Sequence, residues 1–106
     1  MTAKLIKLMP NENEVQLILS GSIYNERALY FKQKLLSHLD DNTKSLSLDM
    51  SNVRYIDSAG MGALLCVRNT ALERGCHFEI KSVGSIVKEI FSINRLNYLL
   101  AAENLS

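Results

Sequence analysis

Residues 49–62, with the sequence DMSNVRYIDSAGMG, connect a strand-like segment to a helix-like segment. Before this stretch, Leu46 and Leu48 alternate with serines, which is the period of two typical of a β-strand. From residue 59 onward, the apolar residues recur at helical spacing. We therefore expect the end of a strand near residue 49, a short loop, and the start of a helix. Either Asp57 or Ser58 can be the N-cap of that helix, because both side chains accept hydrogen bonds from free N–H groups.

Ser58 has two explanations at this position. Its hydroxyl is expected in an exposed loop at the positive end of a helix dipole, where a phosphate group is stabilised. A plain N-cap serine is the alternative, since such a cap stabilises a helix by about 1 kcal/mol. Neither His38 nor His77 lies near Ser58 in the sequence, so the base that a nucleophilic serine needs is not evident. The local sequence therefore favours a capped or modified serine over a catalytic one.

The composition predicts one globular α/β domain spanning residues 1–106, with 47% hydrophobic residues. Twelve basic and eleven acidic side chains give a net charge of +1 without a basic block, so nucleic-acid binding has no electrostatic support. No apolar run approaches the roughly 20 residues of a membrane span. The N-terminus lacks the apolar region of a signal peptide, and we expect a cytoplasmic protein. Cys66 and Cys76 are isolated, so we expect reduced thiols and no metal site.

The rest of the chain alternates strands with helices after an initial hairpin. Residues 3–9 and 15–19 are expected to pair across a turn at 10–13, with Ile6 and Ile18 suggesting that both sheet faces are at least partly covered. The later elements expected are a helix capped by Asn25, a helix ended by Gly75, a strand at 77–83 and a third helix from 84–85. Residues 94–106 fit a short strand or a helical turn. This order predicts a mixed β-sheet of four to five strands with helices packed mainly on one face.

A helical wheel of the second helix shows more apolar surface than one core face usually needs. A core arc runs from Gly60 to Ala71, while Met61, Leu65 and Leu72 form another apolar arc. That second arc either packs under a neighbouring helix or docks a partner next to Ser58. Gly60 and Gly62 are likewise explained either by tight packing on the sheet or by close approach of a partner's backbone.

Two parts of the central stretch carry a recognisable motif, Asp-Met-Ser at 49–51 and Val-Arg-Tyr-Ile-Asp-Ser-Ala-Gly-Met-Gly at 53–62. They resemble the signature of STAS domains, and in particular that of bacterial anti-anti-sigma factors (anti-sigma factor antagonists). Residues 19–21 resemble the end of the strand before the family's first helix, and residues 87–91 resemble its third helix. The resemblance covers almost the whole chain.

The resemblance implies that Ser58 is a phosphorylation site in a partner-switching regulator. Unphosphorylated, such a protein binds an anti-sigma factor that is also a serine kinase, and phosphorylation releases that partner. A PP2C-type phosphatase restores the complex, so a sigma factor and its transcription are regulated only indirectly. The resemblance implies no enzyme activity, no cofactor, no contact with nucleic acid and no direct membrane insertion.

The family's contact surface combines the start of the second helix with the loop before the first. The residues that we expect at this surface are Gly21, Ser22, Tyr24, Asn25, Asp57, Ser58, Ala59, Gly60, Met61, Gly62 and Leu65. Tyr24 stands where the family often has a polar or acidic residue. Ala59 stands where it often has serine or threonine, which removes a second acceptor. The family's C-terminal helix is expected to be reduced to residues 101–106.

Two other functions remain open from the sequence. One is a constitutive STAS accessory subunit of a membrane lipid-transport complex, in which Ser58 is only a cap. The other is a small-molecule or nucleotide-binding STAS module, which ranks last because no glycine-rich phosphate loop is present.

Overall fold

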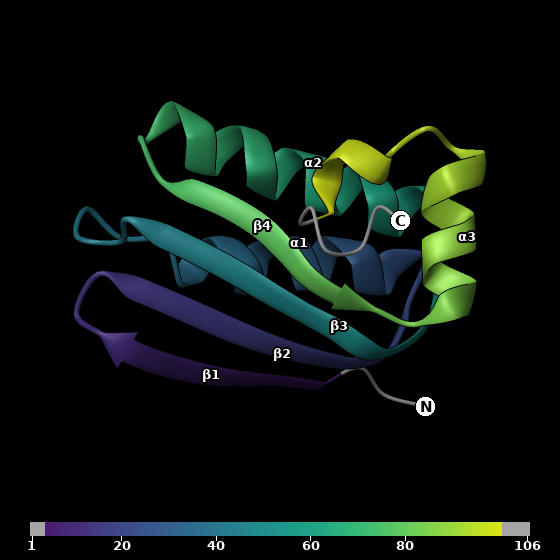
Figure 1. The fold of residues 1–106 in the computed structure, drawn as a ribbon, viewed down its shortest axis with the longest axis horizontal. Coiled ribbons are helices and arrows are strands. Elements are labelled where there is room, and N and C mark those ends of the chain that lie inside the picture. The colour runs from purple at the N-terminus through teal and green to yellow at the C-terminus, as the bar shows by residue number, and fades with distance from the viewer. Residues whose placement is uncertain (1–3, 101–106) are drawn as a thin grey trace.

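Strands and helices alternate along the chain after an initial hairpin (Figure 1). The computed structural model describes residues 4–100. Its elements are β1 (Lys4–Asn11), β2 (Glu14–Ile23), α1 (Glu26–Ser37), β3 (Ser45–Ile56), α2 (Ser58–Glu73), β4 (His77–Val83), α3 (Ser85–Ile93) and the 3-10 turn η1 (Asn97–Leu99). The sheet order is β1-β2-β3-β4; β1 is antiparallel to β2, and the other neighbours are parallel. This confirms the predicted single domain with a mixed sheet.

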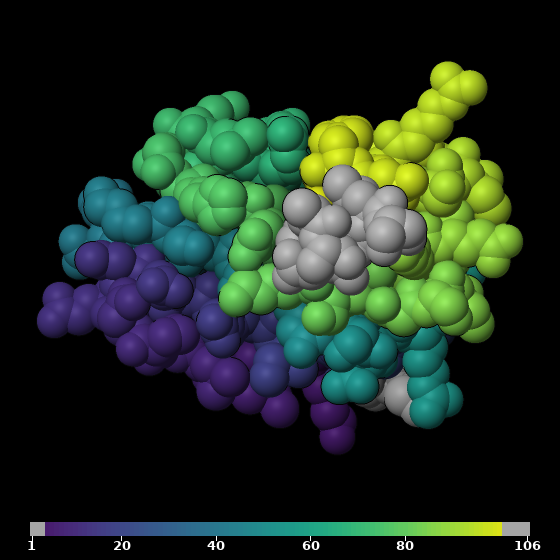
Figure 2. Space-filling view, in the orientation of Figure 1, coloured from purple at the N-terminus to yellow at the C-terminus, as the bar shows by residue number. Residues whose placement is uncertain are grey.

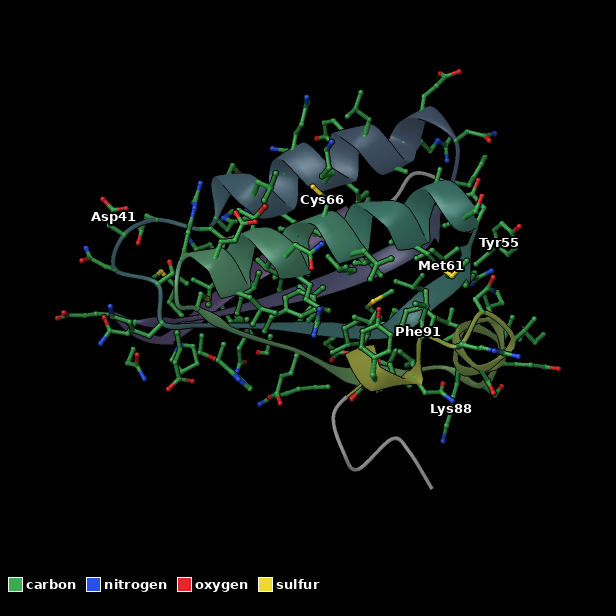
Figure 3. The ribbon with its side chains drawn as sticks, turned by 90° about the horizontal axis from the view of Figure 1, so that it is seen from above. Asp41, Tyr55, Met61, Cys66, Lys88 and Phe91 are labelled. Carbon is green, nitrogen blue, oxygen red and sulfur yellow. The ribbon has the colours of Figure 1, made fainter. Side chains whose placement is uncertain are left out.

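Helices α1 and α2 pack side by side on one face of the sheet (Figures 1 and 3). The residues that face them follow the period of two, since Val15, Leu17 and Leu19 of β2 are all buried. The other face carries no helix within residues 4–100, and side chains of β1 to β3 lie at its surface in Figure 2. Ile6 lies on that open face and is 58% exposed, so the prediction that both faces are covered is wrong at the edge strand.

Strand β3 is longer than the sequence indicates. It continues past Asp49 to Ile56, which pairs with Ile23 at the end of β2. The register shifts between the pairs made by Ile18 and Ser20, because β3 carries one extra residue there. The Asp49 carboxylate accepts hydrogen bonds from the backbone and hydroxyl of Ser51 in this irregular part. The bulge interrupts the alternation of side chains and therefore hides the second half of the strand.

The helix boundaries follow the sequence with one exception. Gly75 has a φ of 73°, the left-handed conformation that ends α2 as predicted. Asn25 is the N-cap of α1, as predicted, but its side chain makes no capping hydrogen bond. Near the C-terminus, η1 confirms the predicted helical turn, and Leu100 forms a single bridge with Ile80 of β4. The helix expected at 101–106 lies outside the described residues.

Candidate functional site

The N-cap of α2 is Asp57. Its Oδ1 accepts a hydrogen bond from the backbone N–H of Gly60 at 2.9 Å, and its own backbone is extended. This N–H is the main reason that the pKa of Asp57 is lowered from its ordinary value, with a further contribution from the N–H of Asn25. Ser58 is therefore the first residue of the helix, and capping does not depend on its hydroxyl.

The same carboxylate reaches a second element. Asp57 Oδ2 accepts a hydrogen bond from the backbone N–H of Asn25 at 3.1 Å, although 32 positions separate the two residues. The backbone N–H of Asp57 donates to the carbonyl of Ile23 at 3.2 Å. Asn25 has a φ of 52°, a conformation that few residues other than glycine adopt. Asp57 thus holds the loop before α1 against the start of α2, and it brings the two predicted contact segments together.

Ser58 presents a free hydroxyl at this junction. Its side chain is exposed, and Oγ makes no hydrogen bond within residues 4–100. A group added to Oγ would break no contact in that part of the chain. It would also lie at a helix start, where unpaired N–H groups favour negative charge.

Gly60 and Gly62 differ in what surrounds them. A Cβ on Gly60 would lie 2.6 Å from Ile56 Cγ1 and 2.7 Å from the Ile23 carbonyl oxygen, so only glycine lets α2 approach the strand ends this closely. A Cβ on Gly62 would meet nothing within 4 Å. Packing on the sheet therefore explains Gly60, whereas no contact within the described residues requires a glycine at 62.

A groove of about 310 Å³ runs between α1 and α2 beside this junction. Ala59 and Gly62 line it from α2, Leu29 and Lys32 line it from α1, and Cys66 lies on the side of α2 that faces α1 (Figure 3). Leu29 is 55% exposed and was missed from the sequence. The sequence does contain a feature that identifies it, because Leu29 is an apolar residue outside the buried stripe of α1.

The second apolar arc of α2 is only partly covered by the chain itself. Met61 is 7% exposed and belongs to the core, so the prediction that it docks a partner is wrong. Leu65 is half-buried against the same core, and the guanidinium carbon of Arg68 lies 5.2 Å from the ring centre of Tyr98 in η1. Leu72, in contrast, is 50% exposed. Packing within the chain therefore explains Met61 and Leu65, whereas the far end of the arc lies at the surface.

The remaining predicted contact residues lie at the end of β2 and in the loop before α1. Gly21 is buried in β2 with a φ of 90°, beside a register shift, so it serves the backbone there and offers no side chain. Ser22 and Tyr24 are half-buried, and the Tyr24 ring lies 5.0 Å from the guanidinium carbon of Arg27. The exposed members of the predicted set are Asn25, Ser58, Ala59 and Gly62. They form one surface at the adjoining starts of α1 and α2.

Other kinds of site are not seen in the described part of the chain. Residues 4–100 contain no group of three or more histidine, cysteine or acidic side chains placed to hold a metal ion. None of their helices is both long and apolar enough to cross a membrane. Cys66 and Cys76 are both free thiols, and burial raises the pKa of Cys76.

Solved structures with this fold include proteins of two kinds. An anti-sigma factor antagonist from Mycobacterium paratuberculosis matches with a TM-score of 0.77 and 17% identity, over 93% of this chain and 83% of that chain. The unphosphorylated anti-sigma factor antagonist SpoIIAA matches with a TM-score of 0.74 and 13% identity, over 92% of this chain and 86% of that one. The murine anion transporter Slc26a9 matches with a TM-score of 0.75 and 19% identity, over 91% of this chain but only 16% of the transporter.

These identities are low, so the likenesses show a shared fold and leave the partner open. The sequence itself gives the family. A family model described as "Mlab, STAS domain" matches residues 7–101, which is most of the chain. The chain therefore belongs to this family of STAS domains.

Proposed function

We propose that this protein is a partner-switching regulator of the anti-sigma factor antagonist kind, controlled by phosphorylation of Ser58. The observation that carries the proposal is the exposed Ser58 hydroxyl, free of hydrogen bonds within residues 4–100, at a helix start that Asp57 already caps. Such a serine can alternate between a hydroxyl and a phosphate while the helix keeps its cap. A phosphoacceptor also needs no catalytic group of its own, because the kinase supplies the base, the metal ions and the ATP.

The proposed partner surface is the one formed by Asn25, Ser58, Ala59 and Gly62, together with the adjacent groove. In the unmodified state, this surface binds an anti-sigma factor with serine kinase activity in the cytoplasm. The bare backbone at Gly62 allows close approach by that partner. Sigma-factor-dependent transcription then responds indirectly, through the anti-sigma factor that has been captured.

Phosphorylation acts on the complex and leaves the fold unchanged. A phosphoserine adds about −1.5 to −2 charges at neutral pH. The N–H groups and dipole of α2 favour that charge by about 0.3–1 kcal/mol at an exposed site. The Asp57 carboxylate, next in sequence, opposes it through repulsion that solvent screens. These opposing terms are small, so the effect arises where a bound partner would exclude water from the phosphate.

The experiment is to incubate the protein with serine kinases of the anti-sigma class and ATP, and to measure its intact mass. We expect a gain of one phosphoryl group on Ser58, removed again by a PP2C-type phosphatase. The absence of any phosphorylation by such kinases, under conditions in which they modify their own known substrates, would contradict the proposal.

A second candidate is a constitutive accessory subunit of a membrane lipid-transport complex. The family description and the fold shared with part of a membrane transporter favour it. In this case the partner binds whether or not Ser58 carries phosphate. Stable purification with a membrane transport complex, unchanged in a Ser58→Ala variant, would support this second candidate over the first.

A further inference from the structure

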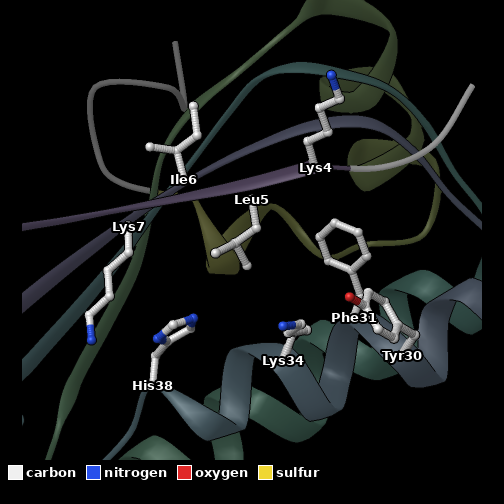
Figure 4. Close-up of a pocket in the computed structure, with 8 residues that line it drawn as sticks. All are labelled: Lys4, Leu5, Ile6, Lys7, Tyr30, Phe31, Lys34 and His38. Atoms are coloured by element: carbon white, nitrogen blue, oxygen red, sulfur yellow. The ribbon is translucent and has the colours of Figure 1, made fainter.

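A separate groove of about 550 Å³ lies between the edge strand β1 and the second half of α1 (Figure 4). Its volume falls in the range of about 300–1,000 Å³ that is typical of small-molecule sites. It shares no lining residue with the groove beside Ser58. The groove arises because α1 leaves part of the inward face of β1 uncovered.

Positive charge dominates the walls of this groove. Lys7 from β1, Lys34 from α1 and His38 directly after α1 line it, whereas the side chain of Lys4 points to the other side of β1 (Figure 4). None of the eight residues that line it is acidic, although the whole chain carries nearly equal numbers of basic and acidic groups. Asp40 senses Lys7 only weakly, because its pKa is lowered mainly by hydrogen bonds from Asn42 and Thr43 and only slightly by Lys7.

The floor of the groove is apolar. Leu5 is half-buried and points from β1 toward α1, whereas Ile6 points to the opposite side of the strand (Figure 4). Phe31 is 3% exposed and lies below the groove, with the more exposed Tyr30 beside it. A ligand that matches both surfaces has a negatively charged group and an apolar body.

A general property of edge strands explains some of the basic residues in this groove, but not all of them. Charged residues on an edge strand prevent pairing with other chains, and this accounts for Lys4 and Lys7. It does not account for Lys34 in α1 or for His38 directly after it, although Lys34 Nζ also lies 5.8 Å from the ring centre of Tyr30. Partial burial first, then Lys7 and Lys34, lower the pKa of His38, so its imidazole is neutral at neutral pH. The two ammonium groups of Lys7 and Lys34 thus line a groove that contains no acidic side chain.

We propose that this groove binds a small organic anion, with a phosphate or carboxylate group held by Lys7, Lys34 and His38 and an apolar substituent packed on Leu5 and Phe31. Such an anion relieves the repulsion among the cations and covers the apolar floor. The chemistry is shared by soluble phosphate monoesters and by the headgroups of anionic lipids. The site is independent of Ser58 and of the function proposed for it.

The first test is an NMR titration of the two histidines with hexyl phosphate. A bound anion should raise the pKa of His38 by about one unit, because it favours the imidazolium form. His77 is the internal control, since it lies outside this groove and beside Glu79 at 3.6 Å. Hexyl phosphate should bind at least about tenfold more tightly than inorganic phosphate, owing to its apolar chain. Equal affinity for the two probes, or equal responses of His38 and His77, would overturn the proposal.

The second test uses matched lysine variants. The double change Lys7→Gln and Lys34→Gln should weaken hexyl phosphate binding about tenfold. Lys44→Gln should leave it unchanged, because Lys44 lines a different surface that also carries Glu12 and Glu14. Circular dichroism checks that all variants fold. Equal losses in the double variant and the control would overturn the assignment.

A vesicle arm distinguishes the two sources of the anion. A lipid headgroup is supported if the protein sediments with phosphatidylglycerol vesicles but not with phosphatidylcholine vesicles, and if the Lys7/Lys34 double variant no longer sediments. Hexyl phosphate binding without sedimentation supports a soluble ligand. Perturbation of β1 by an acidic peptide, with no response to hexyl phosphate, would overturn the proposal in favour of a protein partner.

Discussion

Helices α2 and α3 both begin with an exposed serine directly after a strand and one connecting residue, but the two starts are built differently. Before Ser58, Asp57 supplies a carboxylate that caps α2 and also holds the loop at Asn25. Before Ser85, Gly84 supplies no side chain, and α3 has no side-chain cap. The first start is tied to the loop before a second helix, whereas the second lies beside β3 without such a tie.

This difference shows what distinguishes a candidate switch from an ordinary helix start. An exposed serine at a first helical position is present in both places and is therefore not sufficient. A nearby groove is not sufficient either, because Ser85 itself lines one against β3. What is particular to α2 is a glycine at 62 that no packing contact requires and a neighbouring loop fixed by Asp57. A partner can contact two elements there at once.

The largest expected difference concerns modification. Ser58→Ala should abolish phosphorylation by the cognate kinase, because that kinase recognises the surface around α2. Ser85→Ala should leave the stoichiometry unchanged, although Ser85 is also exposed at the first position of a helix. Intact mass spectrometry after kinase treatment measures both. Full phosphorylation of the Ser58→Ala variant would remove the distinction between the two helix starts.

The first apolar side chains of the two helices should differ strongly in their effect on stability. Met61→Ala should lower the free energy of unfolding by about 2–5 kcal/mol, because it leaves a cavity in the core. Ile86→Ala should change it by no more than about 0.5 kcal/mol, since Ile86 is 62% exposed. Urea unfolding measures both values. A similarly small loss of unfolding free energy in both variants would show that Met61 is not part of the core and belongs to the partner surface.

The two glycines of α2 provide a matched pair with opposite expected signs. Gly60→Ala should destabilise the protein by about 1–3 kcal/mol, because the Ile23 carbonyl oxygen cannot move away from the new methyl group. Gly62→Ala should stabilise it by up to about 1 kcal/mol, since alanine favours the helix and the space is open.

The same Gly62→Ala variant should bind the kinase partner more weakly, because a methyl group then stands on the contact surface. Thermal unfolding and partner titration measure the two effects. Unchanged partner affinity would place Gly62 outside the interface.

Asp57 should give the start of α2 a dependence on acid that the start of α3 lacks. Its pKa is lowered in the folded state, so its contribution is present above the unfolded pKa near 3.8 and is lost as the pH falls through the folded value. Asp57→Asn keeps a capping oxygen but removes the charge, so it should cost about 0.3–1 kcal/mol at neutral pH, with the difference from wild type vanishing in acid. Asp40 also has a lowered pKa, and comparing wild type with the variant cancels its contribution. A difference that does not change with pH would contradict the capping role of the carboxylate.

The smallest effect is expected from adding the missing cap to α3. Gly84 has ordinary extended dihedral angles, and a Cβ there would lie 3.7 Å from the Ser51 carbonyl oxygen. Gly84→Ser should consequently fit and stabilise the protein by a few tenths of a kcal/mol, about the difference between serine and glycine as N-caps. Repeated urea titrations can resolve this gain. A clear loss of stability would show that Gly84 is needed for packing against β3.

Much of the fold could be predicted from the sequence because burial imposes its period on neighbouring residues. The alternation at Leu46 and Leu48 and the stripe from Ala28 to Leu35 both mark surfaces that are buried in the structure. The second half of β3 could not be predicted, because the bulge after Asp49 breaks that period. An alternating sequence pattern therefore predicts a strand only where its pairing with the neighbouring strand stays regular.

The site was predictable where it depends on local residues and not where it depends on distant ones. Asp57 and Ser58 were correctly placed at a helix start. Met61 is buried in the core by tertiary packing, which a helical wheel cannot separate from a partner surface. The hydrogen bond between Asp57 and Asn25 also joins distant segments, and only the tertiary structure shows it.

The most direct measurement of the central claim is the affinity of the kinase partner for the protein with Ser58 either unmodified or fully phosphorylated. We predict a drop of about a hundredfold, equivalent to about 2.8 kcal/mol, which one unpaired charge at an interface can supply. Backbone chemical shifts of the free phosphorylated protein should change only around residues 56–62 and the loop held by Asp57. Equal affinity for the two forms, or shift changes that spread through the sheet and α1, would contradict control by a local charge at Ser58.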